Sequence, residues 1–219
     1  MDPRKDPHRP ITKRKQLLVE GRTPELFFEV FAAHLRLEEV EIRDFRSNSQ
    51  LTPFLKAFCA RAEFKEVVES LAIIRDAERT LRAGEPETEA QTAQQAFESV
   101  RGSLTAASQA VPEVPAAFAA AAPKIGIFIL PNCHDPGMLE SLCLESVKTP
   151  QISECIEQYF SCLETGGNPK PRNMTKARTF CFLASKNISD PLVGRAAQKG
   201  IWPWDSPVFR PLKDFLLAL

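Results

Sequence analysis

The sequence predicts an α/β protein in which a parallel sheet is flanked by helices and followed by a mostly helical C-terminal extension. Short apolar runs typical of strands alternate with helical periodicity over residues 15–131, and this alternation indicates a parallel sheet with right-handed crossovers. From residue 132 onward, apolar residues recur mainly at helical spacing. A length of 219 residues is enough for one sizeable core with an appended subdomain.

Four segments have the composition of buried strands, at residues 15–20, 40–45, 67–75 and 124–130. The last, KIGIFIL, is nearly all apolar, as expected of a central parallel strand. Residues 1–14 are rich in Pro, Arg and Lys, so we expect them to form a flexible tail.

Helices are expected after each strand. Thr23 with Pro24, and Thr52 with Pro53, each place an N-cap residue before a proline suited to the first helical position. Residues 87–107, rich in Ala, Gln and Glu, predict a third helix, and the Pro- and Ala-rich residues 111–123 predict a connector. In the extension, over residues 132–219, further helix starts are predicted at Asp135, Thr149 and Asp190 and helices at 174–185 and 211–219. We expect this extension to pack on the core.

The composition excludes several classes of protein. The net charge is zero, so no overall field attracts nucleic acid, and such a partner would need a local patch. The apolar runs are far too short to cross a bilayer, and the polar N-terminus has no signal segment. We therefore expect a cytoplasmic protein with no membrane partner. Six cysteines without a CxxC pair indicate reduced thiols rather than a zinc ribbon.

Acidic residues lie where two of the predicted strands end. Glu20 ends the first strand, and Asp76 and Glu78 follow the third. Ligands of open parallel sheets bind beyond the carboxyl ends of the strands, at the topological switch point. If the sheet winds outward from its first strand, the first and third strands are neighbours and these acids face one another. Oxygen ligands suit a hard divalent cation, so the pattern predicts a site for Mg²⁺ or Mn²⁺.

The alternative is that these acids are ordinary loop residues. An Asp-x-Glu sequence after a strand is more often a polar loop or a helix start than a metal site. A genuine cluster, however, would be repulsive without a cation. Two like charges about 4 Å apart repel by about 4 kcal/mol at an effective dielectric constant of about 20. Such a cluster therefore favours a bound metal or a raised pKa.

These residues resemble a known family. LLVEGRTPELFF at 17–28 and AIIRDAE at 72–78 resemble the Toprim domain of topoisomerases, primases and OLD-family nucleases. Residues 125–147 and 176–186 more closely resemble a stand-alone Toprim-like group of bacterial and archaeal proteins. The Toprim-like core would cover residues 15–131. The resemblance implies that Glu20 is the family glutamate, a catalytic residue as well as a metal ligand. It also implies that Asp76 and Glu78 match the family's D-x-D motif as metal ligands, with Glu in place of the second Asp.

The resemblance extends to three more acids. OLD-type members often carry an acid just after the glycine turn, and here only Glu25 could stand in, one place later. Nuclease-like members carry a further helix glutamate after the fourth strand. Glu140 is its best match as a metal ligand, and Glu145 is the second choice.

Basic residues gather in one segment that has no acid, between Gly167 and Ser189. They are Lys170, Arg172, Lys176, Arg178 and Lys186. Such a segment would bind backbone phosphates of nucleic acid, with Lys176 or Lys186 contacting the scissile phosphate as a catalytic residue. The alternative is a solvated basic surface.

The resemblance implies a metal-dependent nuclease, or a related phosphodiester-processing enzyme, acting on DNA or RNA in defence or nucleic-acid processing. The one tyrosine, Tyr159, lies on an apolar helical face, which argues against a topoisomerase. Two alternatives stay open. One is a non-catalytic Toprim-like module that works with a separate ATPase, since the sequence has no GxxxxGK[ST] loop. The other is an enzyme acting on small phosphorylated molecules. A homo-oligomer is compatible with each.

Overall fold

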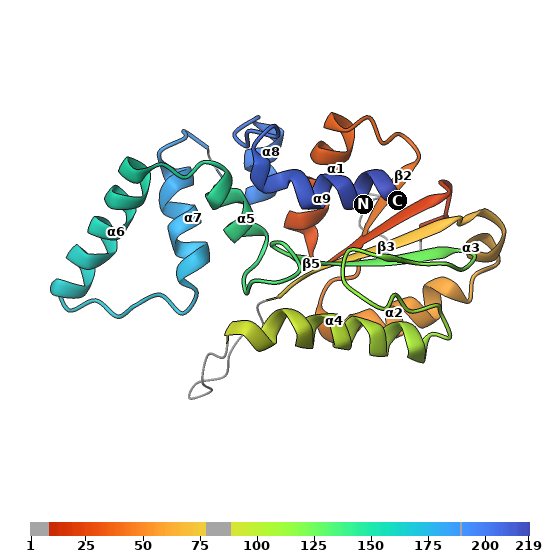
Figure 1. Ribbon diagram of the computed structural model, residues 1–219. Coiled ribbons are helices and arrows are strands. Elements are labelled where there is room, and N and C mark those ends of the chain that lie inside the picture. Colours follow the sequence, from red (N-terminus) through yellow and green to blue (C-terminus); the bar gives the residue numbers. More distant parts are fainter. Residues whose placement is uncertain (1–8, 78–88, 189) are drawn as a thin grey trace.

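A five-stranded sheet forms the centre of the protein in the computed structural model, which describes residues 9–77, 89–188 and 190–219 (Figure 1). The strand order is β2-β1-β3-β5-β4. The first four of these strands run parallel, and β4 pairs antiparallel with β5. The strands are β1 (Lys15–Val19), β2 (Val40–Asp44), β3 (Ser70–Asp76), β4 (Phe118–Ala119) and β5 (Lys124–Leu130). The predicted α/β class is confirmed.

Helices connect the strands and make up the end of the chain. Those up to β5 are α1 (Arg22–His34), α2 (Asn48–Cys59), α3 (Ala62–Val67) and α4 (Glu89–Ala106). Those after β5 are α5 (Leu139–Ser146), α6 (Pro150–Thr165), α7 (Met174–Ala184), α8 (Val193–Gln198) and α9 (Arg210–Ala218), with a 3-10 turn at Pro207–Phe209. In the part of the chain that the structure describes, no helix is long and apolar enough to span a membrane.

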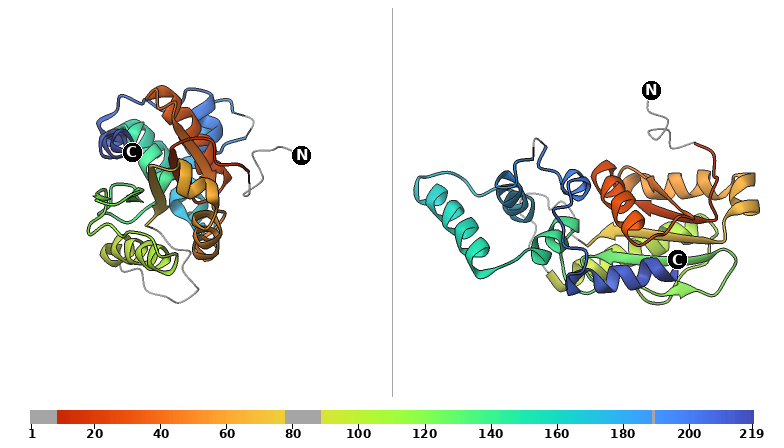
Figure 2. Two further views of the ribbon diagram at one scale, coloured as in Figure 1. Left: turned by 90° about the vertical axis from the view of Figure 1, so that its right-hand side faces the viewer. Right: turned by 90° about the horizontal axis from the view of Figure 1, so that it is seen from above.

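Two apolar layers cover the two faces of the sheet. Leu17 and Val19 of β1 pack into the layer that contains α1, α8 and α9, whereas Leu18 packs into the layer of α2 and α4. Figure 1 shows α9 and α1 above the sheet and α4 and α2 below it. Burial on both faces explains why the strands are almost continuously apolar. Helices α5, α7 and α6 extend past the carboxyl ends of the strands (Figures 1 and 2).

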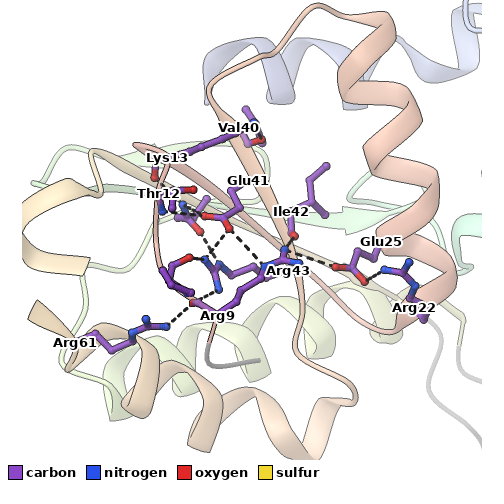
Figure 3. A network of polar contacts seen from close by, with 12 residues as sticks. Arg9, Thr12, Lys13, Arg22, Glu25, Val40, Glu41, Ile42, Arg43 and Arg61 are labelled. Carbon is purple, nitrogen blue, oxygen red and sulfur yellow. Dashed lines mark hydrogen bonds and ion pairs between the residues drawn. The ribbon is translucent and has the colours of Figure 1, made fainter. Parts of the chain in front are cut away.

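The N-terminal segment is packed along the edge strand β2, so the predicted flexible tail is wrong for residues 9–14. Residues 1–8 lie outside the described residues. Ile11 is buried, and buried Arg43 donates hydrogen bonds to the carbonyl oxygens of Arg9 (3.0 Å) and Pro10 (2.6 Å) (Figure 3). Arg43 also pairs with Glu41 at 2.8 Å. The polar composition of residues 9–14 predicted a solvated segment. It could not show the contacts with Arg43, because that residue lies more than thirty positions away in the sequence.

Several element boundaries differ from those predicted. Helix α2 begins at Asn48 rather than Thr52, and the connector at 111–123 contains strand β4. Helix α5 begins at Leu139, because Asp135 and Asn132 form a turn of their own, in which the Asn132 side chain donates to Asp135 Oδ2 at 2.6 Å. The predicted cap at Thr149 is confirmed, since its hydroxyl accepts a hydrogen bond from the amide of Ile152. All six cysteines are free thiols.

The helical extension contacts the core through α8, whose Gly194 lies against α1. A Cβ at this position would lie 2.5 Å from the Thr23 carbonyl oxygen and 2.8 Å from Leu26 Cβ. The small residue therefore allows the backbones of the two helices to approach closely. At the end of the chain, the carbonyl oxygen of Leu219 accepts a hydrogen bond from the buried hydroxyl of Ser70 at 2.9 Å, at the start of β3.

We predict that Gly194→Ala destabilises the protein. The added methyl group would force α8 away from α1, and overpacking of this kind costs about 1–3 kcal/mol. Gly102→Ala is the matched control, because a Cβ at that position in α4 meets no atom within 4 Å. It should stabilise the protein by about 0.5–1 kcal/mol, the usual gain of Ala over Gly in a helix. Urea denaturation measures both, and equal stability of the two variants would contradict the close contact.

Candidate metal centre at the carboxyl edge of the sheet

The topological switch point lies between β1 and β3. These strands pair in parallel, with Val19 opposite Ile74, while β2 lies on the other side of β1. Glu20 directly follows β1, and Asp76 is the last residue of β3. The prediction that the first and third strands are adjacent is therefore confirmed. Glu20 and Asp76 lie at the same edge of the sheet.

Asp76 is in contact with the start of the helical extension. Its Oδ1 accepts a hydrogen bond from the amide of Leu139, the first residue of α5, at 3.0 Å. Burial and then the carboxylates of Glu140 and Glu20 raise the pKa of Asp76 to about 7, against the lowering effects of the Leu139 amide and Lys176. Three carboxylates and one ammonium group, from the turn after β1 and from β3, α5 and α7, thus share one electrostatic environment.

Glu20 is held by contacts with α2 and β3 rather than with α5. Its Oε1 accepts a hydrogen bond from the amide of Asn48, the first residue of α2, at 2.9 Å. Its Oε2 lies 3.8 Å from Nε of Arg75, a side chain that is only 7% exposed. Sequence reasoning missed Arg75, although a cation inside the apolar run AIIRD was a visible signal. Burial lowers the pKa of Arg75, whereas Glu20 and Asp76 counteract that lowering.

The other predicted acids lie elsewhere or outside the described residues. Glu78 is outside them. Glu25 is buried and paired with Arg22 and Arg9, in the network shown in Figure 3. Burial raises the pKa of Glu25, and the two arginines oppose this. The carboxylate of Glu25 therefore belongs to the anchoring of the N-terminal segment.

The second-choice glutamate on α5 also has a partner of its own. Glu145 is exposed and pairs with Lys148 at 2.9 Å. Of the two α5 glutamates, Glu140 is the one whose charge acts on Asp76.

The predicted basic segment is divided by the fold. Lys176 of α7 is the member whose charge acts on Asp76. Arg172 is exposed. The other three have partners within the segment or on α6: Lys170 pairs with Glu164 at 3.2 Å, Arg178 makes a two-point pair with Glu157, and Lys186 lies over the ring of Phe182. The structure thus separates Lys176 from the rest of the run.

The donor chemistry of this edge fits a hard divalent cation. Glu20, Asp76 and Glu140 offer only carboxylate oxygens, the ligands that Mg²⁺ and Mn²⁺ prefer. Burial, followed by the charges of Glu140 and Glu20, raises the pKa of Asp76, and a bound cation would favour its ionised form. Among the described residues, no group of three His, Cys, Asp or Glu side chains stands close enough to hold a metal ion in this arrangement. Chelation by all three carboxylates would therefore require side-chain rotation.

We predict that Asp76 makes stability depend on pH in the absence of metal. Because its pKa is raised to about 7 in the folded protein, the folded state holds the proton more tightly than the unfolded chain. This stabilisation is fully present below the ordinary pKa near 4 and is lost as the pH rises through about 7. Asp76→Asn, which keeps an oxygen for the Leu139 amide, should be more stable than wild type by about 1–3 kcal/mol near pH 8.

Urea denaturation in EDTA at about pH 5 and pH 8 checks this prediction. Glu145→Gln is the control and should follow the wild-type profile. A wild-type stability that did not fall between the two pH values, or an Asp76→Asn variant with the same fall, would contradict the assigned cause.

Comparison with known proteins identifies a family. None of the curated proteins matches the chain. Two similar solved structures are the C-terminal regions of the OLD proteins of Xanthomonas campestris pv. campestris and Burkholderia pseudomallei. The first is 12% identical with a TM-score of 0.47, covering 94% of this chain and 96% of that chain. The second is 11% identical with a TM-score of 0.46, covering 95% and 98%.

One family match spans almost the whole chain. Residues 14–219 match the family described as "Protein of unknown function (DUF3226)". Since the match includes the sheet, the carboxylates at its edge and the helical extension, the protein belongs to this family.

Proposed function

We propose that the protein is a Toprim-like, divalent-metal-dependent nuclease that hydrolyses phosphodiester bonds of DNA or RNA in the cytoplasm. The observation that supports this most directly is the parallel pairing of β1 with β3, which brings Glu20 and Asp76 to one edge of the sheet at the switch point. Burial and the nearby charges of Glu140 and Glu20 raise the pKa of Asp76 there. Perturbed carboxyl groups of this kind cluster at functional sites. The Toprim-like motifs around Glu20 and Asp76 point to the same chemistry.

Three carboxylates would hold Mg²⁺ or Mn²⁺ in this proposal, from Glu20, Asp76 and Glu140, with Glu78 as a further donor. The bound ion would supply positive charge that stabilises the phosphoryl group and activates water. The protein's own contribution is positioning. The Asn48 amide and Arg75 orient Glu20, and the Leu139 amide orients Asp76.

Lys176 is the proposed phosphate-binding residue of the site. Its ammonium group lowers the pKa of Asp76, and in this proposal the same charge would oppose the negative charge of a scissile phosphate. Lys170, Arg172, Arg178 and Lys186 are proposed to contact the nucleic-acid backbone farther along. Because Lys170 and Arg178 pair with α6 glutamates, the phosphate would have to compete with those glutamates for them.

The second candidate is a non-catalytic Toprim-like module that works with a separate ATPase or as a homo-oligomer. It is favoured by the ion pair between Glu20 and Arg75, which partly neutralises the acid that would bind metal. In this case the edge would be a charged docking surface rather than a catalytic centre.

We predict metal-dependent cleavage that requires the three carboxylates. Wild type would be mixed with Mg²⁺ or Mn²⁺ and labelled single- and double-stranded DNA and RNA, with EDTA as the blank. Glu20→Gln, Asp76→Asn and Glu140→Gln should each lower the cleavage rate by about 100-fold or more, the usual effect of removing a charge-stabilising group. Glu145→Gln is the matched control on the same helix. Wild type that binds the metal but cleaves none of these substrates would favour the module.

We also predict that Lys176 contributes more than its basic neighbours. Lys176→Ala should slow cleavage by about 10–100-fold through lost charge stabilisation, whereas Lys170→Ala, which removes a lysine of the same segment, should change the rate less than about threefold. Lys176→Ala should also raise the pKa of Asp76 further in metal-free protein, because Lys176 lowers it. Stability measured against pH would then fall at higher pH than in wild type. Equal cleavage rates for the two variants would remove Lys176 from the site.

A further inference from the structure

A cavity of about 250 Å³ lies beside α2, apart from the carboxylate group. Its lining residues come from the turn after β2, from one side of α2 and from the residue before α3: Phe45, Arg46, Gln50, Pro53, Phe54, Ala57, Phe58 and Arg61. The lining thus combines three aromatic rings with two guanidinium groups and contains no acid. Such walls suit a ligand that has a flat aromatic part and a negative charge.

The aromatic wall is rigid on its inner side. Phe54 and Phe58 are stacked, with ring centroids 5.5 Å apart and an interplanar angle of 23°. The buried guanidinium of Arg43 lies 5.3 Å from the centroid of Phe58, and the ring of Phe64 contacts Phe58 edge-on. Phe58 is therefore fixed from the interior. Phe54 is only partly buried, so its ring retains surface for a further stacking partner.

The positive charge of the cavity comes mainly from Arg46. Its side chain is exposed and makes no ion pair with any residue that the structure describes. Arg61, in contrast, pairs with Glu63 at 3.2 Å and donates to the carbonyl oxygen of Arg9 at 3.0 Å. Arg46 is thus the residue whose guanidinium can bind an anion without first breaking a contact.

The backbone at Arg46 adds a separate observation. Its φ angle is 76°, in the left-handed region that side chains other than glycine rarely adopt, and such residues concentrate at functional sites. Asp44 Oδ1 holds this conformation, since it accepts hydrogen bonds from the amides of Arg46 (2.5 Å) and Gly21 (2.6 Å). Gly21 directly follows Glu20. The carboxylate of Glu20 in turn accepts a hydrogen bond from the amide of Asn48, which lies two residues after Arg46. The cavity is therefore tied to the carboxylate edge from both sides.

We propose that this cavity binds one unstacked base of a single-stranded nucleic acid, with the base on Phe54 and the adjoining phosphate on Arg46. The inference rests on the proposed nuclease function and assigns its substrate class. A duplex hides the faces of its bases by stacking, whereas a single strand offers them to aromatic side chains. The volume of about 250 Å³ is below the roughly 300–1,000 Å³ of typical ligand clefts, which fits one base rather than several.

Binding without catalysis tests the proposal. The full chain carrying Asp76→Asn would be titrated in EDTA against a short labelled single strand of DNA or RNA, read by fluorescence anisotropy. Phe54→Leu, which keeps apolar volume but loses the ring, should weaken binding about tenfold, whereas Phe54→Trp should retain it. Arg46→Ala should weaken binding and reduce the slope of log K against log salt by about 1. Lys56→Ala, on α2 but outside the cavity lining, is the matched control.

Each other outcome has a definite meaning. Equal affinity of Phe54→Leu and wild type, or equal loss in Phe54→Leu and Phe54→Trp, would overturn the stacking site. Tighter binding of the matching duplex would overturn the single-strand assignment. Competition by free AMP at the affinity of the strand would show that a free nucleotide is the ligand. Because no cleavage is measured, a wild type that fails to cut nucleic acid while this cavity still binds it would overturn the nuclease proposal alone.

Discussion

The parallel pairing of β1 with β3 is the constraint on which the candidate site depends. It places the ends of two strands that are more than fifty residues apart in the sequence side by side, so Glu20 and Asp76 share one edge. The pairing is stable because apolar layers cover both faces of the sheet. The acids are thus brought together by hydrophobic burial elsewhere, which also offsets the repulsion between them.

The carboxylates of Glu20 and Asp76 are oriented by helices on opposite faces of the sheet. The amide of Asn48, at the start of α2, donates to Glu20, and the amide of Leu139, at the start of α5, donates to Asp76. Helix N-termini favour negative charge, so each acid is held at the end of a different helix. Arg75 and Lys176 supply the nearby positive charge. The result is an edge whose two carboxylates are each held by the first amide of a different helix.

Asp44 extends this arrangement to the neighbouring cavity. By accepting hydrogen bonds from Gly21 and Arg46, it joins the turn after β1 to the turn after β2. The distance between the carboxylate edge and the aromatic wall is therefore set by the sheet itself. The turn that carries Arg46 is thus joined to the turn that follows β1.

The sequence by itself determined the alternation of strands and helices, the burial of the parallel strands and the presence of acids at their ends, because each of these follows from side-chain periodicity over a few residues. It did not reveal the packing of residues 9–14, the short antiparallel β4, the ion pair of Arg75 with Glu20, or which lysine of the basic run approaches Asp76. Only the tertiary structure decided these features. Each of them depends on contacts between segments that are distant in the sequence. A pattern read over a few residues cannot show how close two charges lie in space.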